Sequence, residues 1–352
     1  MNNGPFHTSV QKILTTVPPA FSKTRAVAVA ADRYGISGSV EPLVSERDQN
    51  FKLTTQAGLG YTLKIANFEE KEDVIDFQNQ ALLHVAKQDP SLPLPRIIPT
   101  IDGQLHCRVE QDGKLHIVRM LSWLEGSIIH DASIDSGLAR RLGQLLARLD
   151  SALQGYDHPG SNAPLLWDMK QAANLAELVV HIEEPGLRQL IDQTLDNFVT
   201  EVKPVLETLR VQVIHNDMNP GNILMDNDRP GQIAGLIDFG DMTRSPLVID
   251  LAVAAAYQLY EGSDPLAGAL PMIAGYHDKE PLQDNEMSLL TDLIRTRLVT
   301  SLLIGTYRST LFPENREYLL ISQRPVRNSL INLSHLRTDE ALSRIRSACL
   351  AS

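Results

Sequence analysis

Two segments decide the fold of this 352-residue chain: VIHNDMNPGNIL at residues 213–224 and GLIDFGD at residues 235–241. Each begins with a short apolar run, which predicts a buried strand, and the first continues into a polar loop. The sequence NDRPG between them is a strong turn signal. A hairpin here would bring Asn222 and Asp238 together, with Asp217 just upstream in the loop.

Asp217, Asn222 and Asp238 have the residue types that phosphoryl transfer requires. The reaction needs a carboxylate that orients the attacking hydroxyl and receives its proton, and it needs hard oxygen ligands for Mg²⁺. Asp217 suits the first role, and Asn222 and Asp238 suit the second. The alternative is that all three are loop residues that cap backbone groups. Their order around one hairpin favours the phosphotransfer interpretation.

These motifs resemble the aminoglycoside phosphotransferase and choline kinase superfamily, with HND at residues 215–217 where many members have HGD. Within it, the chain is most similar to bacterial relatives of hydroxylysine kinase. The resemblance implies an α+β, two-lobe protein-kinase-like fold, Mg²⁺ as cofactor, and ATP or GTP as co-substrate. Residues 1–121 would form a nucleotide-binding lobe with an antiparallel sheet, and residues 122–126 the hinge. Residues 127–352 would form a mostly helical lobe for catalysis and substrate binding.

The candidate nucleotide-binding residues lie on predicted strands and their turns. Alternation predicts a strand at residues 61–65, and the resemblance implies that Lys64 holds the phosphates of the nucleotide; the alternative is a solvated lysine on a strand face. No glycine-rich loop is present, and the polar segment at residues 45–51 stands in its place. Ser45 and Asn50 would donate hydrogen bonds to phosphate there, unless the turn binds no ligand.

A predicted amphipathic helix at residues 71–87 should supply the partner of Lys64. The resemblance places Gln78 where glutamate is common. Gln78 is able to hydrogen-bond Lys64 but not to form an ion pair, so Asp76 is the acidic alternative.

The segment MLSWLEG at residues 120–126 resembles the hinge of the family. The resemblance implies that backbone groups near Ser122 and Leu124 contact the purine of the nucleotide. Trp123 would be a core residue at the interface between the lobes in the alternative interpretation.

An amino-containing acceptor would need a carboxylate or an aromatic face for its ammonium group. The candidates are Trp167, Asp168, Asp241 and Tyr257. Asp168 is equally well explained as a carboxylate in the first turn of a helix. His215 and Asp250 are expected to support the catalytic loop. On a predicted helix at residues 285–311, four side chains face either the cleft or solvent: Arg295, Arg297, Tyr307 and Arg308.

The composition limits the partners. A net charge of −11 argues against nucleic acid or an anionic membrane as a partner. Cys107 and Cys349 have no metal or redox spacing, and no signal peptide is visible, which favours a cytoplasmic location. The expected activity is transfer of the γ-phosphoryl group of ATP or GTP to a hydroxyl of a hydroxylysine- or ethanolamine-like molecule. The alternatives are a homoserine, choline or aminoglycoside kinase, or a nucleotide-binding pseudokinase. Composition leaves the oligomeric state open.

Overall fold

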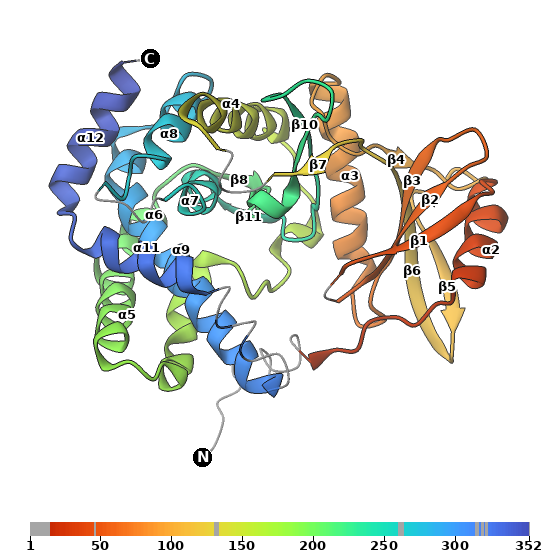
Figure 1. Ribbon diagram of the computed structural model, residues 1–352, viewed down its shortest axis with the longest axis horizontal. Helices are drawn as coiled ribbons and strands as arrows, with labels where there is room; N and C mark the ends of the chain where they lie inside the picture. The colour runs from red at the N-terminus through yellow and green to blue at the C-terminus, as the bar shows by residue number, and fades with distance from the viewer. Residues whose placement is uncertain are drawn as a thin grey trace.

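The computed structural model describes residues 15–45, 47–129, 134–259, 264–313, 317, 320 and 323–351. An antiparallel sheet lies at one end and a mainly helical region at the other, as expected for the α+β class (Figure 1). Among the described residues, no helix has the length and apolar character that a membrane span requires.

The N-terminal sheet contains six strands: β1 (Ser39–Leu43), β2 (Gln49–Thr54), β3 (Gly60–Ile65), β4 (Ile97–Ile98), β5 (Cys107–Gln111) and β6 (Lys114–Ser122). Their order is β1-β2-β3-β6-β4, and β5 also pairs with β6. The register places Asn50, Lys64 and Arg119 side by side on β2, β3 and β6. Cross-strand partners point to the same face of a sheet, so these three polar residues share one face.

Local signals explain the elements around this sheet. Helix α2 (Lys23–Tyr34) is capped by Ser22, whose hydroxyl accepts from the backbone N–H of Arg25 at 3.1 Å, and it covers the outer face of the sheet. The β5–β6 hairpin turns at Asp112 and Gly113, which have φ of 53° and 71°. Positive φ at both central residues is the geometry that favours an Asp-Gly pair.

Helix α3 (Glu72–Gln88) lies between the sheet and the helical region (Figure 1). Its apolar face joins the large core of the helical region, where Phe77 stacks on Tyr156 with ring centroids 5.9 Å apart. The other α-helices are α4 (Ser136–Leu153), α5 (Pro185–Asn197), α6 (Lys203–Leu206), α7 (Val248–Ala256), α8 (Ala269–His277), α9 (Asp284–Leu311), α11 (Arg324–Ser334) and α12 (Thr338–Leu350). The helix that would begin near Asp168 is a 3-10 helix, η3 (Met169–His181), and the segment η4 (Phe198–Val202) is a π-helix.

The two segments at residues 213–224 and 235–241 take part in two antiparallel strand pairs, and a third short strand joins one of these pairs. Strand β8 (Val211–Ile214) pairs with β11 (Thr243–Pro246), and the expected hairpin is β9 (Ile223–Met225) with β10 (Ile233–Leu236). The short strand β7 (Ser127–Ile128) pairs with β9. The 3-10 turns η2 (Pro159–Asn162) and η5 (Pro220–Asn222) complete the elements. The N–H of Ile237 donates to the carbonyl of Asn222 at 2.9 Å, which joins the two loop ends directly.

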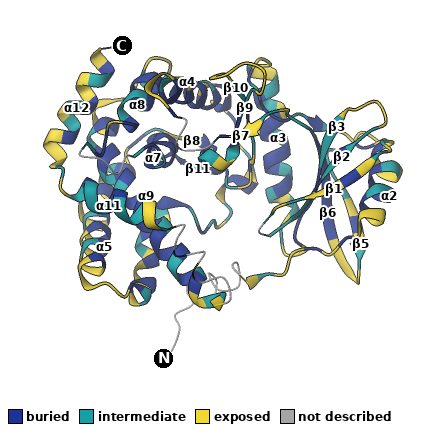
Figure 2. Ribbon diagram, in the orientation of Figure 1, coloured by how far each residue is buried: buried dark blue, intermediate teal, exposed yellow. Residues whose placement is uncertain are grey.

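Figure 2 shows that burial is concentrated in the helical region around α7 and α9. Every residue of α7 is buried, and α9 packs along it. The catalytic loop therefore rests on a fully buried helix, which suits a site that needs fixed geometry.

Candidate active site

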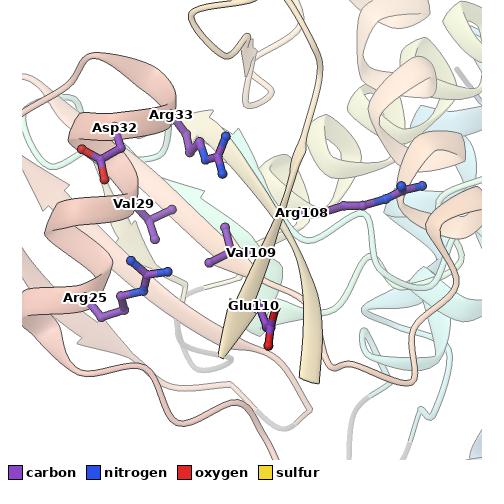
Figure 3. Close-up of a pocket in the computed structure, with 7 residues that line it drawn as sticks. All are labelled: Arg25, Val29, Asp32, Arg33, Arg108, Val109 and Glu110. Carbon is purple, nitrogen blue, oxygen red and sulfur yellow. The ribbon is translucent and has the colours of Figure 1, made fainter. Parts of the chain in front are cut away.

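A cavity of about 790 Å³ lies where the sheet faces the loops of the β8–β11 region. Its lining includes Asn50, Lys64 and Arg119 from the sheet, and Asp217 and Asp238 from the loops. A second pocket of about 250 Å³, shown in Figure 3, lies between α2 and β5 and contains none of the expected site residues. The larger cavity is therefore the candidate active site.

Asp250, at the start of α7, holds the catalytic loop through its backbone. Its carboxylate accepts hydrogen bonds from the N–H groups of His215 at 2.8 Å and Asn216 at 2.7 Å. Asn216 has φ of 65°, in the left-handed region that glycine and asparagine tolerate best. This explains how asparagine is able to stand at residue 216, where the resembled family motif has glycine. Its side-chain amide also donates to the carbonyl of Asp241 at 3.2 Å.

Asp217 points into the cavity and is held from two sides. The amide of Asn222 donates to its Oδ2 at 2.8 Å and to its carbonyl at 2.9 Å. Its own N–H donates to Nδ1 of His215 at 3.2 Å, and the His215 ring packs edge-on against Phe239. Burial raises the pKa of Asp217, and the nearby charge of Arg297 opposes that shift. A carboxylate whose pKa is raised is a better proton acceptor in catalysis.

Asp238 follows β10 with φ of 60° and presents its carboxylate to the cavity, where half of the side chain (51%) is exposed. Nζ of Lys64 lies 3.4 Å from Oδ1 of Asp238, and the N–H of Gly240 donates to the same oxygen at 3.2 Å. The positive charge of Lys64 lowers the pKa of Asp238, which keeps it ionised.

The expected pairing of Lys64 with α3 is wrong. The carbonyl oxygen of the Gln78 side chain instead accepts from Nη2 of the buried Arg119 at 2.5 Å, and the Gln78 amide donates to the carbonyl of Gly240 at 3.2 Å. Asn79 accepts from Nη1 of Arg119 at 3.0 Å. Helix α3 is thus bonded to an arginine of β6, because its amides are neutral acceptors and Lys64 already has a carboxylate partner.

Asp76 points elsewhere as well. Its Oδ2 lies 3.2 Å from Nε2 of His158, and its Oδ1 accepts from Gln80. Asp76 is therefore not the acidic partner of Lys64.

The four remaining nucleotide candidates divide into two pairs. Ser45 and Asn50 line the cavity, and Oδ1 of Asn50 has no hydrogen-bond partner among the described residues. Ser122 and Leu124 are outside the lining. The N–H and hydroxyl of Ser122 bond Arg96, and the Leu124 side chain packs on Gly235. The backbone N–H of Ser122 is therefore already used by the carbonyl of Arg96 and is not available for the expected contact with the purine.

The substrate candidates are only partly in the cavity. Trp167, Asp241 and Tyr257 line it, whereas the buried Asp168 caps η3 by accepting from the N–H of Lys170 at 3.0 Å. The alternative explanation of Asp168 as a helix carboxylate therefore holds. Burial, and then the charge of Asp217, raise the pKa of Asp241 to about 7.

Arg297, in the middle of α9, is a cavity residue that the sequence left undecided. The buried guanidinium donates from Nη2 to the hydroxyl of Tyr257 at 3.2 Å and lies 3.5 Å from Oδ1 of Asp217. It stands 5.1 Å from the Trp167 ring centroid and 5.8 Å from that of Tyr257. Arg295 points away, towards Asp292 and the carbonyls of Leu333 and Leu336.

The fold and the loop geometry define a protein-kinase-like phosphotransferase. Residues 39–282 match the phosphotransferase enzyme family, abbreviated APH, and the chain belongs to this family. Its members with curated functions include a hydroxylysine kinase of Danio rerio, 29% identical over 92% of this chain and 94% of that protein. A homoserine kinase of Rhizobium rhizogenes is 28% identical over 64% of this chain and 66% of that protein.

The fold is confirmed by a solved amicoumacin kinase in complex with AMP-PNP, Ca²⁺ and Ami. It superposes with a TM-score of 0.65 at 16% identity, over 85% of this chain and 93% of that one. The chain is thus a small-molecule kinase that uses an alcohol group as acceptor.

Proposed function

We propose that this kinase transfers the γ-phosphoryl group of ATP or GTP to a hydroxyl of a small amino-containing metabolite of the hydroxylysine or ethanolamine type. One observation carries the proposal: a partly buried carboxylate, Asp217, and a lysine–carboxylate pair, Lys64 and Asp238, border the same cavity. The similarity to hydroxylysine kinase over nearly the whole chain supports the acceptor class. The homoserine kinase relative makes a short hydroxy amino acid the second candidate.

In this proposal Asp217 receives the proton of the acceptor hydroxyl as the oxygen attacks the γ-phosphorus. The bond between the γ-phosphorus and the bridging oxygen breaks, and the nucleoside diphosphate leaves. Asn222 fixes the Asp217 carboxylate through Oδ2, and Oδ1, which has only the long 3.5 Å contact with Arg297, would receive the proton. Lys64 would move from Asp238 to the phosphates once nucleotide is present, because phosphate offers it a denser negative charge.

The residues around Asp238 fit a magnesium ion. Asp238 is an ionised and accessible carboxylate, and Asn222 uses its amide nitrogen for Asp217, which leaves its oxygen as a ligand. The described residues include no group of three or more acidic, histidine or cysteine side chains placed to hold a metal ion, so phosphate oxygens and water would complete an octahedral site. When bound, Mg²⁺ neutralises charge on the phosphates. Asn50 and Ser45 would donate to the phosphates, and Asp241 would face the ammonium of the acceptor.

A direct test measures nucleotide-dependent phosphorylation of hydroxylysine, homoserine, ethanolamine, choline and an aminoglycoside, with ATP and with GTP. Product mass identifies the acceptor. The proposal predicts transfer to at least one of the first three acceptors, with choline and the aminoglycoside poor or inactive. Mg²⁺-dependent nucleotide binding without transfer to any acceptor would indicate a pseudokinase instead.

A further inference from the structure

Arg297 is a buried cation with unused hydrogen-bonding capacity inside the active-site cavity. The residue is 2% exposed, yet among the described residues its Nε and Nη1 have no hydrogen-bond partner. Only Nη2 is engaged, by Tyr257 and at 3.5 Å by Asp217. Buried donors without partners are costly, so a guanidinium placed in this way points to a missing acceptor.

The aromatic residues that the sequence suggested for an ammonium group are already used. The guanidinium of Arg297 lies over Trp167 and Tyr257 at 5.1 and 5.8 Å from the ring centroids. These rings therefore already bind a cation of the protein itself. An empty aromatic cage would attract the ammonium group of a substrate, but this part of the cavity presents a positive charge instead. This arrangement disfavours choline-like acceptors and favours an acceptor with a negative group.

We propose that Arg297 binds a carboxylate of the acceptor, so that the substrate is a hydroxy amino acid and not a simple amino alcohol. The inference rests on the proposed function and narrows its acceptor class. A carboxylate matches the planar fork of a guanidinium and would supply an acceptor to Nε or to Nη1, each of which shares one edge of the planar group with Nη2. Asp241, on the lining of the same cavity, would face the ammonium group.

The position next to Asp217 agrees with this assignment. Nη2 of Arg297 is near the carboxylate that receives the proton, and the unpartnered Nε and Nη1 belong to the same planar group. A carboxylate bound there would lie a few bonds from a hydroxyl at Asp217, which is the spacing of a small hydroxy amino acid. The competing explanation is that Arg297 only positions Asp217, but that role uses one nitrogen and leaves two without partners.

The test compares matched acceptor pairs. Hydroxylysine and homoserine are each assayed beside the amino alcohol formed by removing the carboxylate. Wild-type protein should prefer the carboxylate-bearing member in kcat/KM by roughly 10- to 100-fold, as expected for charge-assisted hydrogen bonds. In Arg297→Gln this preference should disappear, chiefly through KM, and Arg297→Lys should restore part of it.

The ratio within a pair separates the two explanations, because any effect through Asp217 lowers both members equally. Equal losses for both members in Arg297→Gln would overturn the inference, and so would a wild-type enzyme without the preference. Arg308→Gln is the matched control, since Arg308 lies on α9 and also lines the cavity. It should keep the preference, and loss of the preference in this variant alone would assign the carboxylate to Arg308.

A binding measurement keeps the inference independent of turnover. Calorimetry with lysine and with its decarboxylated diamine, neither of which has a hydroxyl, measures carboxylate recognition alone. Lysine should bind more tightly to wild-type protein than to Arg297→Gln, while the diamine shows no such difference. Equal lysine affinity in both would overturn the inference. Carboxylate-dependent binding without phosphoryl transfer would contradict the proposed function and leave the role of Arg297 intact.

Discussion

At the scale of single residues, backbone conformation explains why the catalytic motif has asparagine at residue 216. Asn216 and Asp238 both have positive φ, at 65° and 60°. Asparagine and aspartate tolerate this region better than other residues with a Cβ. Asp250 stabilises this strained conformation of the loop, because its carboxylate accepts hydrogen bonds from the backbone N–H groups of His215 and Asn216. The loop is therefore fixed before any ligand arrives.

The left-handed conformation of Asn216 makes a prediction about stability. Asn216→Gly and Asn216→Ala both lose the hydrogen bond to the carbonyl of Asp241, so the difference between them isolates the effect of φ. Alanine should be less stable than glycine by about 1–2 kcal/mol. Chemical denaturation of the two variants measures this difference. Equal stabilities would mean that the loop has a different conformation in solution.

At the scale of elements, patterns within the chain predicted strands and helices well. Alternation, turn residues and helical periodicity are local signals, and they located β3, the β9–β10 hairpin, α3 and α9. The sequence predicted the side-chain contacts between different elements less well. The partner of α3 is Arg119, which is 40 residues away from Asn79 in the chain, and no local pattern reports it.

Arg297 shows the same limit for another reason. Helix α9 is buried on almost every side over its middle turns, so its apolar residues do not mark one inner face. Periodicity then cannot tell which polar residue points into the cavity. The 3-10 geometry of η3 was missed because its apolar spacing resembles that of an α-helix. The sequence did not distinguish a capping role of Asp168 from a substrate-binding role, and the structure shows that Asp168 caps η3.

The corrected partners of α3 give a prediction at this scale. Asp76 pairs with His158 and not with Lys64, so Asp76→Ala should keep kcat/KM within about threefold of wild type. Lys64→Ala should lose at least about 100-fold, because in the proposed mechanism it removes the charge that stabilises the transferring phosphates. Steady-state kinetics of both variants decides the point. Comparable large losses in Asp76→Ala and Lys64→Ala would instead indicate that Asp76 is the partner of Lys64.

At the scale of the whole molecule, the cavity joins two differently built parts. The sheet contributes Lys64, and the loops on the helical region contribute Asp217 and Asp238. In the structure these parts meet through the Lys64–Asp238 pair and through Gln78, which bonds both Arg119 and Gly240. A nucleotide with Mg²⁺ bound between them would stabilise the fold as a unit.

This linkage predicts a metal-dependent thermal shift. A nucleotide at about 100 times its Kd should stabilise the wild-type protein by about 2.7 kcal/mol. Chelation of Mg²⁺ should remove most of this stabilisation, because phosphate affinity depends on the metal. Asp238→Ala should show little shift with or without Mg²⁺. The exposed control Asp339→Ala, on α12, should behave like wild type. A full metal-dependent shift in Asp238→Ala would contradict the metal role of Asp238.

The role of Asp217 is the central claim, and one variant tests it most directly. Asp217→Asn keeps the size of the side chain and one acceptor oxygen for Asn222, but it cannot accept the proton of the acceptor. With the acceptor found by the substrate screen, its kcat should fall by about 100- to 10,000-fold. Its Kd for the Mg²⁺–nucleotide complex, measured by calorimetry, should stay within about twofold of wild type, because the proposed role of Asp217 is towards the acceptor and not the nucleotide. A kcat near that of wild type would contradict the assignment.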